Sequence, residues 1–278
     1  MTSRRLRIAV IGHVEHVTVG RVPAPPAAGE IAHLEEPRWL PGGGGGIAFF
    51  QLARSAGEVH LFTALGDDDA ARQVEARLRD SRAHIHAARR REAHSRDIVM
   101  VTPAGERTII VVGEPLHPER SDDLPWDMLA SCDAAYFTAQ DPEAIRAARA
   151  ARLLVVTARR SQALARSGVR ADVVVGSVRD LRETSTLADY AVPPKALVMT
   201  EGALGGSVET AGGLVRFASA ARESPVVGAY GAGDSFAGAL TWYVASGLPV
   251  VEACARAAVH GAAVLSCLDP LECQLPLE

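Results

Sequence analysis

The sequence predicts an α/β fold: one domain, residues 1–278, built on a doubly wound, mostly parallel sheet with helices on both faces. The first observation is a steady alternation of short apolar runs with segments of helical length, which is typical of parallel β/α units. The second is composition, because 48% hydrophobic and 22% charged residues suit one large core. No repeat, low-complexity linker or composition break marks a second domain. In such a sheet, ligands are expected beyond the carboxyl ends of the strands.

The elements are expected in the following order. Short apolar runs predict buried strands at 6–11, 59–65, 134–138, 153–157, 172–175 and 196–200. Helices are expected at 47–53 (after five glycines), from the cap at 66–69 to 78, and at 143–151, 162–166, 234–246 and 251–265. Two hairpins interrupt the alternation, because turn residues separate β-prone runs at 97–102 and 107–112 and at 207–210 and 214–218.

Nearly all positive charge is arginine, because Lys195 is the single lysine among 29 basic residues. A Walker-type phosphate loop, a eukaryotic-type protein kinase and a Schiff-base enzyme each need a lysine in a defined context. Lys195 follows two prolines and has none of these contexts. The sequence therefore excludes these three mechanisms.

Charge and segment patterns bear on partners and location. A net charge of −4 and a pI near 6.2 argue against a nucleic-acid partner, since that binding needs clustered cations. The chain starts with a short strand rather than a long apolar segment, so we expect neither a signal peptide nor a membrane span. We expect a cytoplasmic location. The cysteines lack metal-site spacing and are expected to be reduced thiols: Cys132, Cys254, Cys267 and Cys273.

The most informative stretch is Gly231-Ala232-Gly233-Asp234, at the start of a predicted helix. Unpaired backbone amides and the helix dipole make such a start an anion site, and small side chains let a phosphate approach the backbone. The spacing alone leaves two possible roles for Asp234. It is either a helix cap or a general base that takes a proton from a hydroxyl attacking the bound phosphoryl group.

With Ser235-Phe236 following, this stretch resembles the G-A-G-D signature of the ribokinase-like, or PfkB, carbohydrate kinases. Four further motifs fall in that family's order and spacing along nearly the whole chain: Gly12, Gly43 to Gly46, Gly66-Asp67-Asp68, and Thr200 to Gly205. The resemblance implies a ribokinase-like fold and an ATP-dependent kinase that uses Mg²⁺.

The resemblance also implies roles for residues. Asp234 matches the catalytic base, and Gly231, Ala232 and Gly233 match the anion hole for the transferring phosphoryl group. Gly43 and Gly44 match the loop on which the sugar lies. The residues that match the ATP site or lie near it are Thr200, Gly202, Gly205, His260 and Ser177.

The family's β lid is matched by two inserted segments, about 14–40 and 95–114. The resemblance implies that the lid covers the sugar, excludes water and pairs with a second copy in a homodimer.

Several residues depart from the family pattern. Ser177-Val178-Arg179-Asp180 replaces N-x-x-E, and Asp180 is expected to order magnesium through water. Gly228 replaces an aspartate associated with a monovalent cation, and 267–270 replaces a glycine-containing loop, so activation by K⁺ is doubtful.

On the sugar side, Ala48 and Val17 replace an asparagine and an aspartate of the family. Glu15 lies two residues before Val17, on the same face of a continuing strand, and is expected to bind sugar hydroxyls. Gln140 falls where ribokinases place an acid. These changes alter the accepted hydroxyl pattern, so ribose is not assumed.

Three functions follow. The first is an ATP-dependent kinase of a sugar or similar small polyol. The second is a nucleoside kinase, with Trp39, Phe49 and Phe50 available to form a slot for the base. The third is a sugar-binding or regulatory protein whose kinase activity has decayed.

Overall fold

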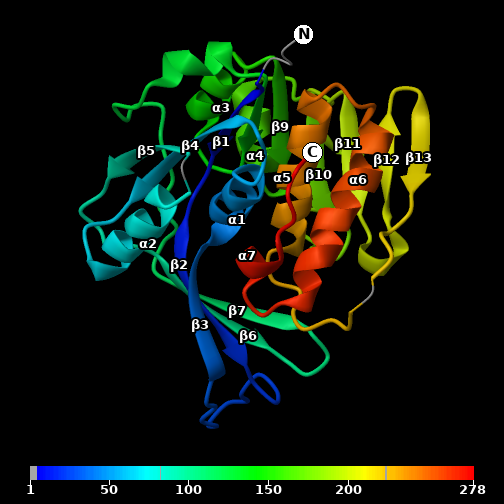
Figure 1. The fold of residues 1–278 in the computed structure, drawn as a ribbon. Coiled ribbons are helices and arrows are strands. Elements are labelled where there is room, and N and C mark those ends of the chain that lie inside the picture. The colour runs from blue at the N-terminus through cyan, green and yellow to red at the C-terminus, as the bar shows by residue number, and fades with distance from the viewer. Residues whose placement is uncertain (1–4, 82, 223) are drawn as a thin grey trace.

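A nine-stranded sheet, in the order β13-β12-β11-β10-β9-β8-β1-β4-β5, runs through the centre of the protein (Figure 1). The structure is a computed structural model and describes residues 5–81, 83–222 and 224–278. The strands of this sheet are β1 (Arg7–Ile11), β4 (Glu58–Leu65), β5 (His84–Arg89), β8 (Ala134–Phe137), β9 (Leu153–Thr157), β10 (Val173–Ser177), β11 (Ala196–Thr200), β12 (Gly206–Thr210) and β13 (Gly213–Phe217). All neighbours from β11 to β5 are parallel, and β12 and β13 add an antiparallel hairpin.

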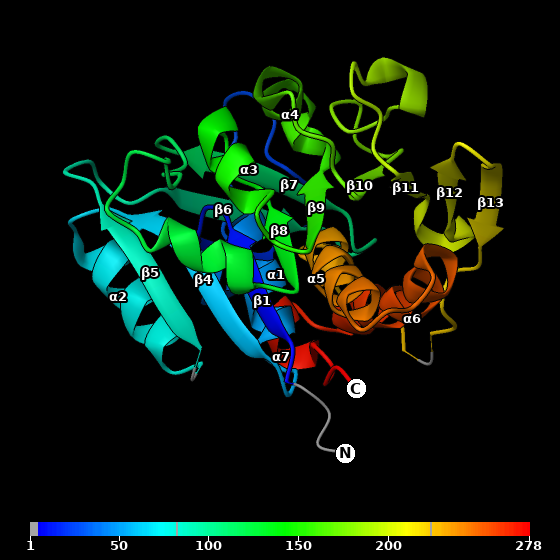
Figure 2. The ribbon, with the colours of Figure 1, turned by 90° about the horizontal axis from the view of Figure 1, so that it is seen from above.

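Helices cover both faces of this sheet (Figure 2). The α-helices are α1 (Gly43–Leu52), α2 (Asp69–Arg79), α3 (Pro142–Ala148), α4 (Ser161–Ser167), α5 (Ala232–Ala245), α6 (Val250–Ala263) and α7 (Pro270–Cys273). Short 3₁₀ turns lie at η1 (Trp126–Ser131), η2 (Ala158–Arg160), η3 (Leu187–Asp189), η4 (Gly202–Leu204) and η5 (Val264–Ser266). The predicted doubly wound fold is confirmed.

The core forms one apolar layer on each face of the sheet. Side chains of α1, α2, α5 and α6 pack on one face, around Phe49, Val74 and Leu240. Side chains of η1, α3 and α4 pack on the other, around Phe62 and Phe137. Both layers arise because the central strands are unbroken apolar runs, which must be covered on two sides.

A second sheet of four strands, in the order β3-β2-β6-β7, lies at the carboxyl end of β1 (Figure 1). Its strands are β2 (Glu15–Arg21), β3 (Glu35–Gly42), β6 (Arg96–Val101) and β7 (Arg107–Val112). The segments expected at 14–40 and 95–114 thus pair with each other, β2 running parallel to β6. We call this second sheet the β lid.

Two elements differ from the sequence expectation. Helix α1 begins at Gly43 rather than at residue 47, so the glycine run is itself helical. Close packing explains it, because a Cβ atom at Gly45 would lie 2.5 Å from the carbonyl oxygen of His13. Strand β5 was not expected: it is an edge strand whose residues are only half-buried or exposed, so it shows no apolar run. Within the described ranges, no helix has both the length and the apolar character needed to cross a membrane.

Candidate active site

The first turn of α5 presents open backbone next to Asp234. The helix starts after Gly231, which has a left-handed φ of 77° and makes no side-chain cap hydrogen bond. A Cβ atom at Gly233 would meet nothing within 4 Å, so the space beside this turn is open. Exposed amides at a helix start attract anions, and the glycines leave room for one to approach.

Side chains from three segments converge on the backbone of Gly44, the second residue of α1. A Cβ atom at Gly44 would lie 3.2 Å from Oδ1 of Asp234 and 3.1 Å from Oγ1 of Thr138. The Gly44 amide donates to Nε2 of His13 over 3.4 Å. The glycine expected to meet the sugar and the aspartate expected to be the base therefore lie together.

Glu15 adds a second carboxyl beside this position. A Cβ atom at Gly43 would lie 3.1 Å from Oε2 of Glu15, and the Gly43 amide donates to the hydroxyl of Tyr230 over 3.1 Å. Burial, the nearby charge of Asp97 and a hydrogen bond with Asp97 raise the pKa of Glu15. Burial also raises the pKa of Asp97, on β6 of the lid. Both residues are almost fully buried, at 5% and 4% exposure, and Oδ1 of Asp97 has no hydrogen-bond partner among the described residues.

The pKa of Asp234 is raised to about 6, first by burial and then by the charge of Glu183, while Arg107 and Arg159 oppose the rise. A carboxyl with such a pKa is ionised at neutral pH and is a stronger base than an ordinary aspartate. The electrostatics therefore suit proton abstraction by Asp234.

Arginines supply positive charge around these acids. Arg159 bonds to both Asp180 and Glu183 from η2. Burial and the charge of Arg159 lower the pKa of Arg160 to about 10, and its Nε donates to the carbonyl oxygen of Thr138 over 2.9 Å. Arg159 and Arg160 therefore place positive charge near Asp234 and Glu15 respectively.

Of the two acids after β10, Glu183 is the one whose charge acts on Asp234. Asp180 bonds to Arg159 and Arg182, and its pKa is lowered because an amide hydrogen bond and these arginine charges outweigh burial. Oε2 of Glu183 accepts from the amide of Ser177 over 3.1 Å. Carboxylate oxygens are the donors that Mg²⁺ prefers, so both acids fit an ion held through water.

The residues expected at the nucleotide lie on neighbouring strands. Ser177 ends β10 and is the register partner of Thr200, which ends β11. Gly202 and Gly205 follow with φ of 64° and 84°, and a Cβ atom at Gly202 would lie 2.7 Å from the guanidinium carbon of Arg179. This group therefore sits at the carboxyl ends of the strands, as the fold predicts.

Two expected residues have other surroundings. His260 is buried on α6, where its Nε2 lies 3.0 Å from the hydroxyl of Tyr243, so it packs between α5 and α6. Its contact with adenine stays a prediction. Gln140 is exposed and lines a hollow that His117 also lines, and the His117 ring lies 4.9 Å from that of His13. A sugar contact for Gln140 also stays a prediction.

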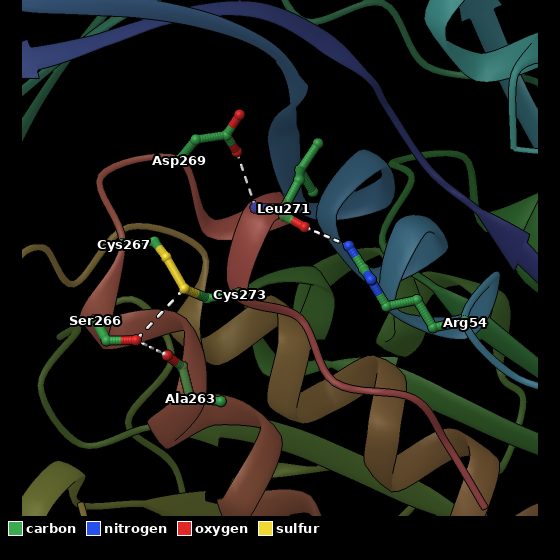
Figure 3. Close-up of a disulfide and its surroundings, with 7 residues drawn as sticks. All are labelled: Arg54, Ala263, Ser266, Cys267, Asp269, Leu271 and Cys273. Carbon is green, nitrogen blue, oxygen red and sulfur yellow. Dashed lines mark hydrogen bonds between the residues drawn. A yellow bond between two sulfur atoms is a disulfide. The ribbon is translucent and has the colours of Figure 1, made fainter. Parts of the chain in front are cut away.

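Cys267 and Cys273 form a disulfide, so the expectation of reduced thiols is wrong for this pair (Figure 3). Cys132 and Cys254 are free and buried, as expected. Figure 3 shows the disulfide joining Cys267 to Cys273, the last residue of α7; between them Asp269 caps the amide of Leu271, and Arg54 donates to the Leu271 carbonyl oxygen. No sequence pattern indicated the disulfide, because the two cysteines are six residues apart and become neighbours only through the fold of residues 267–273.

The turn that contains α7, closed by the disulfide, packs against the start of α5. A Cβ atom at Gly231 would lie 3.0 Å from the Pro270 ring, and Leu271 packs in one cluster with Tyr230. The turn therefore constrains the backbone that begins α5.

Several residues of the site were missed in the sequence. They are His13, Asp97, Thr138, Arg159, Arg160 and Glu183. His13 and Thr138 could have been found from their positions, because each follows a buried strand at the carboxyl-end edge of the sheet, where ligands bind. Glu183 and the arginines carry no local signal, since charged residues in loops are usually solvated.

Comparison with known proteins gives one family and one fold. The family described as "pfkB family carbohydrate kinase" matches residues 5–276. No curated protein matches the chain in sequence.

Solved structures share the fold at low identity. Ribokinase from Thermotoga maritima superposes with a TM-score of 0.77 at 17% identity, covering 98% of this chain and 96% of that one. Adenosine kinase from Sinorhizobium meliloti has a TM-score of 0.77 at 19% identity and covers 96% of each chain. Phosphofructokinase-2 from Escherichia coli has a TM-score of 0.74 at 14% identity, with 96% and 97% covered. These neighbours share one architecture and differ in the acceptor that their names give.

Proposed function

The chain belongs to the pfkB family of carbohydrate kinases, and from this premise we propose that it transfers the γ-phosphoryl group of ATP to a hydroxyl of a sugar or similar small polyol. The observation that carries the proposal is the convergence of Asp234, Thr138 and His13 on the Gly44 backbone. An acceptor hydroxyl placed there would lie beside a carboxylate of raised pKa and next to an open helix start.

In the proposed reaction, an oxygen of Asp234 takes the proton of the acceptor hydroxyl. The hydroxyl oxygen forms a bond to the γ-phosphorus while the bond from that phosphorus to the bridging oxygen of ADP breaks. The amides of Gly231, Ala232 and Gly233 would stabilise the charge on the transferring group, because they lie at the positive end of α5, where the space beside Gly233 is open.

The carboxylates after β10 are the proposed magnesium ligands through water, with Glu183 added to the expected Asp180. Mg²⁺, when bound, neutralises charge on the phosphates. The chain's own part is to hold Glu183 in place, through the Ser177 amide and Arg159, at a position from which its charge acts on Asp234. ATP would lie along Thr200, Gly202 and Gly205, at the ends of β10 and β11.

The pair of Glu15 and Asp97 is the proposed recognition element for acceptor hydroxyls. Both residues belong to the β lid, since Glu15 begins β2 and Asp97 lies on β6, which pairs with β2; Glu15 also lies beside Gly43 of α1. A buried carboxyl oxygen without a partner favours an acceptor that donates a hydrogen bond to it. Binding of the acceptor would thus hold the lid in place and exclude water from the phosphoryl group.

The aromatic residues give the nucleoside alternative less support than the sequence suggested. Phe49 is fully buried in the core and is unavailable for the base slot that this hypothesis needs. Trp39 stacks on His16 at a ring distance of 5.1 Å but is 42% exposed, and Phe50 is half-buried. The nucleoside-kinase alternative therefore keeps these two residues and the fold shared with adenosine kinase.

The lid also presents the surface for the proposed homodimer. Four consecutive residues of the edge strand β7 are apolar and 39–50% exposed: Ile109, Ile110, Val111 and Val112. Exposed apolar edge strands are costly in a monomer and tend to be covered by pairing.

The experiment is a coupled assay of the purified protein with Mg-ATP and a panel of pentoses, hexoses, polyols and nucleosides. ADP release that depends on one sugar or polyol supports the proposal. Activity with nucleosides only would replace the acceptor class. Calorimetry with Mg-ATP tests the third function, because sugar binding without nucleotide binding would indicate a binding or regulatory protein.

A further inference from the structure

Three histidines and a glutamate cluster at the edge of the large sheet, on β4 and β5. Glu58 and His60 lie two residues apart on β4, so they share one face of the strand, and His84 is the register partner of His60 on β5. These strand positions lie near the amino ends of β4 and β5, whereas the candidate active site lies at the carboxyl ends. The cluster therefore plays no part in the proposed kinase reaction.

The ligand atoms of this cluster face one another. Nε2 of His60 lies 2.9 Å from Oε1 of Glu58, and the rings of His60 and His84 stack at 4.5 Å. One ligand atom from each of Glu58, His60 and His84 can be chosen so that all three lie within 4.8 Å of one another. We propose that Glu58, His60 and His84 form a site for a divalent transition-metal ion of the Zn²⁺ type.

The chemistry of the donors selects this class of ion. Two imidazoles and one carboxylate are borderline ligands that bind Zn²⁺, Ni²⁺ or Cu²⁺ in preference to Mg²⁺ or Ca²⁺, which take oxygen ligands. His60 is buried at 4% exposure, whereas His84 is exposed. The ion would reach the site from solvent and keep open positions on the side of His84.

His86 orients the buried ligand. Its Nε2 lies 3.1 Å from Nδ1 of His60, and its ring packs on Phe62 at 4.8 Å. A metal-binding histidine is commonly held by a hydrogen bond at its second ring nitrogen, which fixes the ring and its tautomer. With the Nδ1 proton of His60 donated to His86, Nε2 presents its lone pair toward Glu58, where the ion would sit.

Arg7 opposes the ion. It bonds to both oxygens of Glu58, with Nε and an amino nitrogen each 3.1 Å away. Its positive charge lowers the affinity for a cation but leaves the second lone pairs of the carboxylate available. The proposal thus makes an unusual prediction: removal of Arg7 strengthens metal binding.

The test is calorimetry of ZnCl₂ with tag-free, EDTA-treated full-length protein at pH 7.5. We expect one zinc per chain at this site, a Kd at least tenfold weaker in His84→Gln, and a Kd several-fold tighter in Arg7→Met. His84 is exposed, so its variant should fold, and His33→Gln is the matched control because His33 is an exposed histidine of the lid segment. Zinc should also raise the Tm of the wild type and not that of His84→Gln.

A second variant separates this site from the acids of the active site. Asp234→Asn should keep the zinc affinity of the wild type at the β4–β5 site. No zinc binding by the wild type, or equal zinc binding by the wild type and His84→Gln, would overturn the proposal.

Discussion

Asp234 lies against the backbone of Gly44: a Cβ atom added to that glycine would be 3.2 Å from the aspartate's Oδ1. The first residue belongs to α5 and the second to α1. These helices pack together, and Gly44 lies beside Thr138, which follows the carboxyl end of β8. We place the acceptor hydroxyl beside this contact, with the Gly44 backbone on one side and the proposed base on the other.

Alanine at position 44 should fill the acceptor space. The new methyl group would lie 3.1–3.2 Å from Thr138 and Asp234, and a displacement of about 1 Å in the acceptor costs on the order of 10²-fold in rate. We expect kcat/KM of Gly44→Ala to fall by about that factor with a Tm close to that of the wild type. Gly212→Ala is the matched control, because its Cβ atom makes only an ordinary 3.5 Å contact. Equal losses in both variants, or none in Gly44→Ala, would contradict the placement.

The pH dependence of kcat/KM should report the ionisation of Asp234. Its pKa is about 6 and the base must be deprotonated, so the rate should rise tenfold per pH unit below 6 and level off above 7. The charge of Glu183 contributes to the raised pKa of Asp234, so in Glu183→Gln the rise of kcat/KM with pH should occur at lower pH. If that rise occurs at the same pH in the variant as in the wild type, the ionisation belongs to another group.

The Glu15 and Asp97 pair should strengthen acceptor binding and lower the stability of the folded protein at neutral pH. Burial and mutual proximity raise the pKa of Glu15, and burial raises that of Asp97, so their ionisation at neutral pH costs stability. The folded state holds these protons more tightly, so this contribution is present at low pH and is lost as pH rises through the raised values. Asp97→Asn should therefore raise Tm at pH 7.5, and KM for the acceptor should rise about tenfold, or about 1.4 kcal/mol.

Exposed Asp127 provides the control for that pair. Asp127→Asn should leave both Tm and KM unchanged. An unchanged acceptor KM in Asp97→Asn would remove Asp97 from the recognition element.

The apolar strand β7 should hold two copies together. Ile110 is 47% exposed on this strand, so Ile110→Glu should turn a dimer into a monomer by light scattering after size-exclusion chromatography. Leu181→Glu is the control, because Leu181 is 92% exposed in the loop after β10, away from the lid. A wild type that is monomeric at micromolar concentration would refute the dimer.

Much of the fold could be predicted because its signals are local. The buried strands are short apolar runs, and Asp68 caps α2 through the amide of Ala71, as the acid run at 67–69 indicates. The small residues before Asp234 likewise indicated the start of α5, whereas the helix after the glycine run was placed at residue 47 and begins at Gly43. Strand β5 could not be predicted, because its half-buried and exposed residues form no apolar run and the strand arises from pairing with β4.

The site could be predicted only where one residue carries the chemistry. Asp234 and Gly44 stand in recognisable motifs, whereas the pairing of Glu15 with Asp97 depends on β2 meeting β6. The same holds for Glu183, whose charge on Asp234 follows from packing and not from spacing. The Cys267–Cys273 disulfide likewise depends on a turn that no local pattern marks.

The turnover of Asp234→Asn in Mg-ATP with the identified acceptor is the most direct test of the proposed kinase reaction. The substitution removes the proton acceptor and leaves the helix start and glycine loop in place, so kcat should fall by about 10²- to 10⁴-fold while Mg-ATP still binds. Tm at pH 7.5 should equal or exceed that of the wild type, because burial raises the pKa of the aspartate and makes its ionisation costly. A folded Asp234→Asn variant that phosphorylates the acceptor at nearly the wild-type rate would contradict the account.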